Sequence, residues 1–509
     1  MSVEPRGYEY PPQSIHVVPL PADFEQLFPK PTGLTEDVWP TAQNNYLGFY
    51  LKRLSCKTVL IEGHYIDRDF IDDLALFYSR SLRGYPNYCQ RLHFFSEELD
   101  DDRWKKLISD ANGGKRERVR QFLQKSYLGF SVVRPLPGSL IGRTVLPTFP
   151  TNTAEGHRRD FGATREYRVH LAGFDLVVSG LAFQQQDQGV SACATTALWS
   201  AIHKVAPMEG LPFATPAAIT QAASRYFLAG GRALPSEGLT IDQICEATRS
   251  SGLAPIVVRG LALEQARAQL HGYLTSGLPA VLALQPLPLT RSEGHAVCAV
   301  GLKLGEVAPQ TNPDYHFRDV ATSVMAVYVH DDRLGPYAVA DLQSHTLPSG
   351  DIVPALVIRW PGEKAEFETC VLRAIIVPAP PKLRLTVARM RSLGVVIAEA
   401  VGERLPELQG RVDLSCRYRV STEYQQMAFD FGLSDEGILE LSSRTVLSRY
   451  LGVVHLDGPS GPLFDVLLDA TETQANPSVL CCVSRRGLPV AGKPLMAFIA
   501  RRLGGTVIG

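Results

Sequence analysis

The sequence predicts a mixed α+β fold in three regions, and three features of the chain indicate it. Strand-like and helix-like segments alternate up to about residue 150, which predicts an N-terminal α/β domain over 1–150. Over 160–376, helical segments come first and short apolar runs separated by Gly and Pro follow, which predicts a helical half and an antiparallel β half. The Pro-rich segment VPAPPKLRL (377–385) indicates a linker to a C-terminal α+β module over 383–509.

The first region contains readable local signals. KTVLIEG (57–63) and RLHFFS (91–96) are typical of buried strands, and an amphipathic helix is expected after the first of them. A Gly-Gly break precedes a basic segment, GGKRERVRQFLQK (113–125). Since aromatic residues do not alternate with the basic ones in this segment and the chain is close to neutral, we expect an exposed helix rather than a nucleic-acid site.

The second region opens with two expected strands in REYRVHLAGFDLVVSG (165–180) and continues with helices. Thr215 followed by Pro216 has the pattern of an N-cap and first helical residue. Thr240 and Gln243 have the spacing of a capping box. These signals support a helical half before the strands that begin near residue 278.

Composition excludes several classes of protein. The 509 residues carry a formal net charge of −1, so no whole-chain charge favours nucleic acid or an anionic membrane. The N-terminus lacks the basic and apolar parts of a signal peptide, and no stretch reaches the roughly 18 apolar residues of a membrane span. We therefore expect a soluble, cytoplasmic protein.

The nine cysteines are scattered and include no CxxC pair, so a zinc ribbon is not expected. The segment EGHYIDRDFIDD contains His64 and four aspartates, but its spacing matches no known ligand set. We expect a solvated acidic helix face there. No metal or cofactor is predicted.

Cys193 has the context of a nucleophile. It lies in FQQQDQGVSACATTALWSAI (183–202), directly before an apolar pattern with the 3.6-residue period of a buried helix. A thiol attacks as the thiolate, and the partial positive charge of a helix N-terminus favours that form. Small neighbouring residues leave room for a substrate carbonyl.

A base and an orienting acid follow in the β half. His295, in SEGHAVCAVGLK, begins an expected strand, and the strand in SVMAVYVHDD ends at Asp331 and Asp332. If these two strands pair, both side chains lie at one sheet edge, where a carboxylate can fix the imidazole tautomer. We predict Asp331 for this role, with Asp332 as the alternative.

An oxyanion needs donors beside the sulfur. The Cys193 N–H can provide one, and a glutamine amide upstream can provide the other. Gln186 and Gln188 both lie at a suitable distance along the chain, and Gln186 is the predicted donor.

Over about 175–345, this order of motifs resembles the papain-like cysteine peptidases, most closely the bacterial bacteriocin-leader peptidases. The resemblance implies Cys193 as nucleophile, His295 as general base, Asp331 as orienting acid and Gln186 as oxyanion donor. This chain departs from the family because residue 187 is Asp, because Cys-Ala replaces Cys-Gly, and because 36 residues separate His295 from Asp331.

Three functions remain open at this point. The first is hydrolysis of a peptide or isopeptide bond through a thioester, with a protein or peptide substrate and flanking domains that bind a partner protein. The second is acyl transfer by the same three residues. The third is a non-catalytic papain-like scaffold or interaction module, in which the His295 ring would lie away from Cys193.

Overall fold

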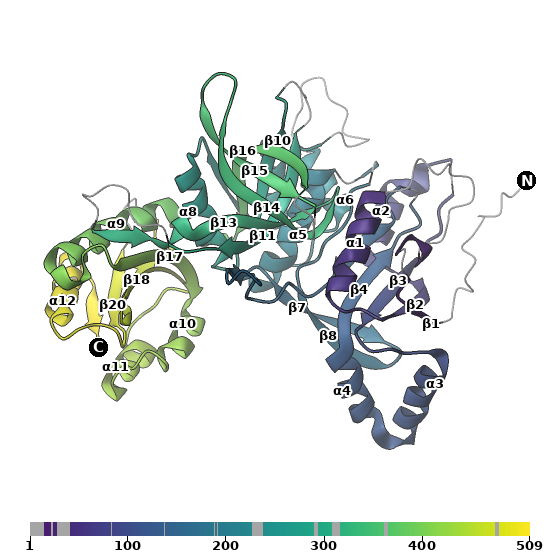
Figure 1. Ribbon diagram of the computed structural model, residues 1–509, viewed down its shortest axis with the longest axis horizontal. Coiled ribbons are helices and arrows are strands. Elements are labelled where there is room, and N and C mark those ends of the chain that lie inside the picture. The colour runs from purple at the N-terminus through teal and green to yellow at the C-terminus, as the bar shows by residue number, and fades with distance from the viewer. Residues whose placement is uncertain are drawn as a thin grey trace, which may run out of the picture.

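The computed structural model describes residues 15–21, 24–27, 41–82, 84–136, 138–187, 189–190, 192–225, 238–289, 294–307, 316–360, 365–473 and 478–509. Its chain forms three bodies, with the central one between the N-terminal and C-terminal ones (Figure 1). Within the described residues, no helix combines the length and apolar character that a membrane crossing requires.

The N-terminal body is built on a five-stranded sheet in the order β1-β2-β3-β4-β5. Its strands are β1 (Ile15–Pro19), β2 (Thr58–Tyr65), β3 (Cys89–Phe95), β4 (Tyr127–Val133) and β5 (Ile141–Val145). Its helices are α1 (Thr41–Arg53), α2 (Arg68–Leu76), α3 (Asp101–Asp110) and α4 (Arg116–Ser126). The strands expected at 57–63 and 91–96 are β2 and β3.

All neighbouring strands of this sheet are antiparallel. The sequence predicts an α/β domain here, and the sheet corrects this to an antiparallel α+β arrangement. Alternation of helices and strands along the chain does not fix strand direction, because a helix can also join two antiparallel strands.

The hairpin of β7 (Arg165–Leu171) and β8 (Phe174–Gly180) packs on the N-terminal body rather than opening the central one (Figure 1). The side-chain amide of Gln124 binds both backbone groups of Val177, donating at 2.9 Å and accepting at 2.8 Å. Arg91 donates to the His170 carbonyl. The N-terminal body therefore includes residues beyond the boundary expected near 150.

The central body combines four helices with a closed barrel of six antiparallel strands. The helices are α5 (Cys193–Met208), α6 (Pro216–Ala223), α7 (Ile241–Ser250) and α8 (Leu263–Leu274). The barrel strands are β10 (Ala280–Pro286), β11 (His295–Leu304), β13 (Val324–Asp331), β14 (Gly335–Thr346), β15 (Ile352–Arg359) and β16 (Glu366–Ala379), and β16 pairs back with β10. Two further strands, β6 (Arg158–Asp160) and β9 (Ala254–Arg259), pair with β11 and β16.

The starts of α6 and α7 are those predicted, whereas no helix is predicted over the residues of α8. The Thr215 hydroxyl accepts from the Ala218 N–H at the start of α6, and Pro216 is the first helical residue. Thr240 and Gln243 form a reciprocal capping box at the start of α7. The helices and the antiparallel barrel together confirm the mixed α+β class.

The C-terminal body is a six-stranded sheet with four helices. Its strands are β12 (Phe317–Asp319), β17 (Val412–Val420), β18 (Tyr450–Gly458), β19 (Gly461–Asp469), β20 (Val479–Ser484) and β21 (Thr506–Ile508). Its helices are α9 (Val387–Arg404), α10 (Ser421–Ala428), α11 (Asp435–Leu439) and α12 (Gly492–Arg502). The edge strand β12 comes from the chain between β11 and β13 and pairs in parallel with β17, so the two bodies share a strand.

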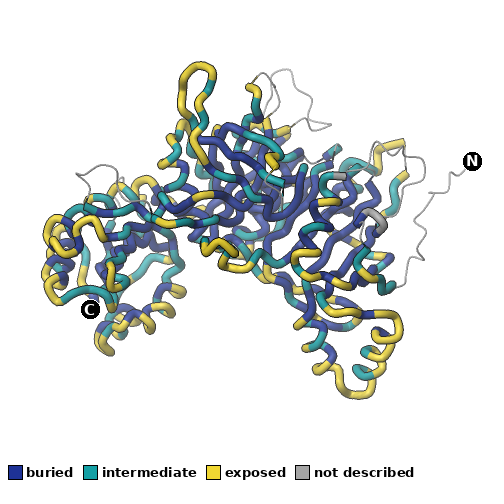
Figure 2. The backbone as a smooth tube through the Cα atoms, viewed as in Figure 1, coloured by how far each residue is buried: buried dark blue, intermediate teal, exposed yellow. Residues whose placement is uncertain are grey.

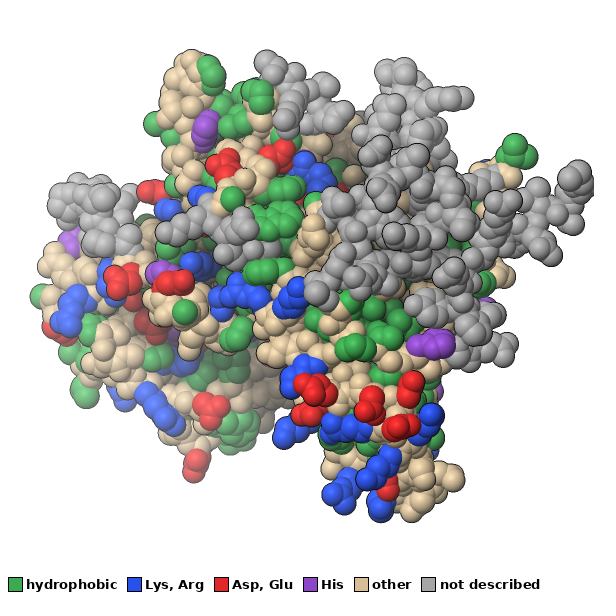
Figure 3. Space-filling view, turned by 45° about the vertical axis from the view of Figure 1, so that its right-hand side comes forward, with side chains coloured by type: hydrophobic (Ala, Val, Ile, Leu, Met, Phe, Trp, Pro, Cys, Tyr) green, Lys and Arg blue, Asp and Glu red, His purple; other side chains and the backbone are tan. Residues whose placement is uncertain are grey.

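Two expectations about charged segments have opposite outcomes. The basic helix α4 follows the predicted break, where Gly114 has a φ of 90°, and it lies in a mostly exposed helical projection with interspersed basic and acidic side chains (Figures 2 and 3).

The acidic face of α2 is not solvated, since Asp69 and Asp73 are buried. This prediction is wrong because the α6 backbone of the central body binds Asp73, and Arg143 of β5 pairs with Asp69.

Candidate active site

Cys193 is the first residue of α5, where an extended segment turns into a buried helix. Ala192 precedes it as the N-cap residue with extended backbone angles (φ −78°, ψ 170°). The N–H groups of a first helical turn carry partial positive charge, which lies beside Cys193. The body of α5 packs on the barrel strands, which fixes where the sulfur lies.

Cys193 is also the one partly exposed thiol among nine free cysteines. Burial raises the pKa of the other eight, which are Cys56, Cys89, Cys245, Cys298, Cys370, Cys416, Cys481 and Cys482. These eight have the character of small core residues. Cys193 alone is both partly exposed to solvent and next to a side chain that can be charged.

That neighbour is His295, the first residue of β11. Its Nε2 lies 3.0 Å from Asp331 Oδ1, and the Cys193 side chain lies near enough to the ring to raise the pKa of His295. Because Nε2 faces the carboxylate, Nδ1 is the ring atom left for the sulfur. The structure thus brings together the helix start and the strand start that the sequence singles out.

The pairing of β11 with β13 explains this meeting. The two strands are antiparallel, with Cys298 opposite His330. The start of β11 and the end of β13 therefore lie at one edge of the barrel, as predicted. Asp331 ends β13 there and is fully buried.

The surroundings of His295 and Asp331 favour the charged form of each side chain. Burial alone would lower the pKa of His295, but the charge and hydrogen bond of Asp331, with the Cys193 contact, raise it to about 10. Burial would raise the pKa of Asp331, yet His295 and Arg333 lower it to about 2. The Arg333 N–H also donates to Asp331 Oδ1 at 3.0 Å. The ring is therefore held as an imidazolium at neutral pH.

Asp332 differs from its neighbour. It is 3% exposed, and its carboxylate oxygens have no hydrogen-bond partner within the described part of the chain. Burial and the charge of Asp331 raise the pKa of Asp332 to about 6, against the lowering effect of His295. Asp331, rather than Asp332, is thus the carboxylate that binds the ring.

His295, Asp331 and Asp332 are also the group whose donor atoms could hold a metal ion. Among the described residues they alone form such a set, with one donor atom each within 4.8 Å of one another. The buried hydrogen bond between His295 and Asp331 and the Arg333 contacts already account for two of the three. The contacts that are present therefore fit an imidazolium–carboxylate pair.

The glutamines upstream of Cys193 differ in burial and in hydrogen-bond partners, and this decides which of them could bind an oxyanion. The Gln185 amide is used by the backbone of Ile141 and Gly138, and Gln184 is buried. Gln186 is partly exposed, which keeps it the predicted donor, whereas Gln188 lies outside the described residues. The oxyanion assignment remains a prediction.

Residues that hold this segment in place were not found from the sequence. Arg134, in the N-terminal body, contacts the Gln185 carbonyl and Asp187. Asp187 is visible in the sequence only as a departure from the papain-like pattern. The one signal for Arg134 is an arginine placed between an apolar strand and a proline, in FSVVRPLPG.

Comparison with known proteins gives no relative: no protein-family model matches the chain, and no curated protein matches it either. The geometry around Cys193 is therefore the ground for inferring a function.

Proposed function

We propose that this protein is a papain-like cysteine hydrolase that cleaves a peptide or isopeptide bond through a thioester. One observation carries the proposal: a partly exposed thiol at a helix start lies beside a buried imidazole, which is itself paired with a buried carboxylate. A non-catalytic scaffold has no need for this order of three groups.

In the proposed reaction, the Cys193 thiolate attacks the substrate carbonyl carbon. The carbonyl oxygen becomes an oxyanion, which the Cys193 N–H and the Gln186 amide would stabilise. The His295 imidazolium then gives its proton to the leaving amine, and a thioester remains. Water, activated by the now neutral His295, hydrolyses the thioester and releases the acid.

Asp331 has the role of an orienting acid in this scheme. Its carboxylate accepts from His295 Nε2, which fixes the ring orientation and stabilises the imidazolium. The same intermediate reacts with an amine in place of water to give acyl transfer, so the acceptor decides between the two outcomes.

The test is covalent labelling of Cys193. Limiting iodoacetamide at pH 6–7, followed by peptide mass spectrometry, should modify Cys193 first, since an ordinary thiol with a pKa of about 8.5 reacts slowly there. Cys193→Ala should abolish this labelling and the release of p-nitrophenolate from p-nitrophenyl acetate. Cys245→Ala, which removes a buried thiol, is the matched control and should leave both unchanged. Undiminished ester cleavage by C193A would refute the proposal.

A further inference from the structure

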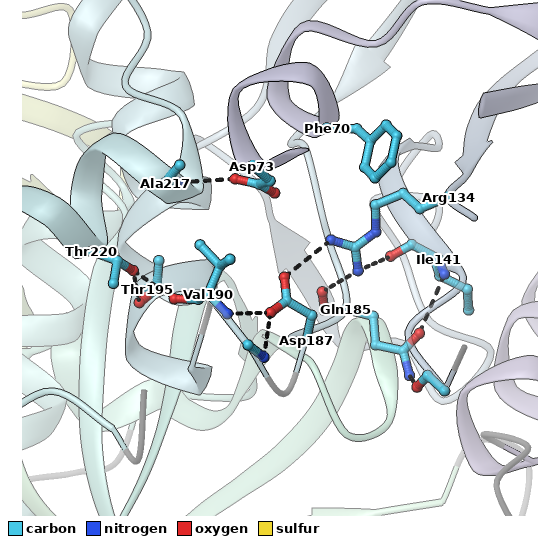
Figure 4. A network of polar contacts seen from close by, with 12 residues as sticks. Phe70, Asp73, Arg134, Ile141, Gln185, Asp187, Val190, Thr195, Ala217 and Thr220 are labelled. Carbon is cyan, nitrogen blue, oxygen red and sulfur yellow. Dashed lines mark hydrogen bonds and ion pairs between the residues drawn. The ribbon is translucent and has the colours of Figure 1, made fainter. Parts of the chain in front are cut away.

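The segment that precedes Cys193 is held by a buried arginine from another body of the protein. Arg134 follows β4, and its side chain is 2% exposed. Its Nη2 donates to the carbonyls of Gln185 at 2.9 Å and Ile141 at 3.4 Å. Its Nη1 lies 3.7 Å from Asp187 Oδ2 (Figure 4). One side chain thus joins β4, β5 and the chain just after Gln184.

Asp187 fixes the backbone of the residues that follow it, Gly189 and Val190, through its side chain. Its Oδ1 accepts from the backbone N–H groups of Gly189 at 2.9 Å and Val190 at 2.5 Å. The other oxygen faces Arg134, so one buried carboxylate links the arginine to two amides (Figure 4). Gln186 lies between the two points that Arg134 contacts.

The far end of the segment is held by α6. The Thr220 hydroxyl donates to the Val190 carbonyl at 2.8 Å and lies 3.3 Å from the Thr195 hydroxyl on α5. The α6 start is bound in turn by Asp73 of α2, which accepts from the Ala217 N–H at 3.0 Å. Figure 4 shows these contacts on the side of Asp187 opposite to Arg134.

We propose that Arg134 and Asp187 are positioning residues that set the oxyanion-binding segment around Gln186 (described residues 185–187 and 189–190), so that the N-terminal body is part of the active site. The inference rests on the proposed function and names the residues that prepare its transition state. Arg134 acts through Gln185 and Asp187, and it has no contact with Cys193 or His295 among those described.

The charges around Arg134 support this division of roles. Asp73 and Asp187 face one guanidinium, and burial, followed by the charge of Asp187, holds the pKa of Asp73 well above its usual range. Asp73 binds the Ala217 N–H, whereas Asp187 lies within ion-pair distance of Arg134, so Asp187 is the carboxylate that pairs with the guanidinium. The buried Asp187 carboxylate accepts hydrogen bonds from two backbone amides and faces an arginine, and such an arrangement holds a loop rigidly.

Two reagents distinguish an effect on the oxyanion-binding segment from an effect on the reactivity of the Cys193 thiol. With p-nitrophenyl acetate, Cys193 Sγ bonds to the acetyl carbon, the C–O bond breaks and p-nitrophenolate leaves, through an oxyanion that needs donors. With iodoacetamide, Sγ bonds to the methylene carbon and iodide leaves, and no oxyanion forms. The ratio of the two second-order rate constants therefore reports on the oxyanion-binding segment alone.

We expect Arg134→Met and Asp187→Ala to lower this ratio about 100-fold, since misplacing an oxyanion donor has an effect of that order. Alkylation by iodoacetamide should stay within about threefold of wild type. Asp187→Asn keeps the acceptor for Gly189 and Val190 and should recover most of the ratio. Arg134→Lys keeps the charge but loses the fork of donors that reaches Gln185, Ile141 and Asp187, so it should recover little. The control is Arg91→Met, which removes another buried arginine of the N-terminal body, one that binds Glu62 and His170 instead.

A wild-type ratio in both Arg134→Met and Asp187→Ala would overturn the inference, as would an equal loss in Arg91→Met. Circular dichroism identifies any variant that fails to fold, and in that case the Asp187→Asn and Asp187→Ala pair decides. Failure of the proposed function looks different: wild-type Cys193 itself would then show no preferred alkylation and no acylation.

Discussion

Asp331 and Asp332 are adjacent and equally buried, but their carboxylates have different partners. Asp331 binds His295 and the Arg333 amide, whereas the Asp332 carboxylate has no partner within the described chain. We expect Asp331→Asn to lower the rate of Cys193 alkylation at pH 7 by about tenfold or more, because the imidazolium loses its counter-charge and its tautomer is no longer fixed. Asp332→Asn is the matched control, with a rate within about threefold of wild type. The opposite order would assign the orienting role to Asp332.

The same aspartate gives a prediction about stability and pH. The pKa of Asp332 rises from 3.8 to about 6 on folding, so between these values the unfolded chain is ionised while the folded one keeps its proton. The folded state then binds more protons, and stability falls as pH rises through this window, by about 3 kcal/mol at most.

We therefore expect Asp332→Asn to reduce the change in unfolding free energy between pH 4.5 and 6.5, measured with urea at both values. The His295–Asp331 pair does not obscure the result. The stability from Asp331 is lost below pH 3.8, and that from His295 is lost above pH 6.5. Identical slopes in the variant and the wild type would contradict the prediction.

At the scale of elements, the hairpin of β4 and β5 carries Arg134 toward the segment before Cys193. The arginine stem crosses Gly142 so closely that a Cβ there would lie 2.9 Å from Arg134 Cγ and 3.1 Å from Cδ. Gly142→Ala should therefore displace the side chain and lower the ratio of acylation to alkylation by about tenfold. Gly113→Ala, where an added Cβ meets open space, is the control. An unchanged ratio in G142A would show that Arg134 tolerates displacement.

Elements with local signals could be predicted from the sequence. The helix start at Cys193 has an apolar period after it, and the strands that begin at His295 and end at Asp331 alternate or run apolar between turn residues. Their pairing follows once both are strands in one antiparallel sheet. This part of the candidate site was therefore accessible without the structure.

Contacts between distant segments gave no such signal. The Arg134–Asp187 ion pair joins residues 53 positions apart, and β12 pairs with β17, which lies beyond the predicted linker. The buried Asp69 and Asp73 have the spacing of a helix face, but the spacing does not say whether water or another body covers it. Burial of a polar group depends on a partner, which local sequence does not name.

At the scale of the whole molecule, the N-terminal body contacts both sides of the candidate site. Besides Arg134, its helix α1 contacts the turn after Asp331: Gln43 donates to the Asp332 carbonyl at 3.3 Å, and Tyr46 donates to the Pro336 carbonyl at 2.8 Å. The N-terminal body thus contacts both the segment before Cys193 and the turn after Asp331. The first region therefore contacts the candidate site directly, and its binding of a partner protein stays a prediction.

The C-terminal body is connected to the central one in a different way, through β12. Arg318 binds Asp413 through two hydrogen bonds of 2.6 and 2.8 Å, and Arg391 of α9 binds Asp319 through two more. A Cβ on Gly402 would lie 2.4 Å from His316 Cβ, so α9 packs directly on the start of the shared strand. These contacts do not depend on the covalent link between the bodies.

We therefore expect the two bodies to stay together when that link is cut. A site-specific protease sequence inserted between the exposed residues Pro381 and Lys382 allows the cut in the folded protein. After cleavage, residues 1–381 and 382–509 should elute as one species in size-exclusion chromatography and separate only in denaturant. Phe317→Asp, which places a charge at a buried position of β12, should let the cut fragments separate without denaturant. Separation of the unsubstituted fragments in native buffer would show instead that β12 adds little to the joint, and that the C-terminal sheet is held by its linker.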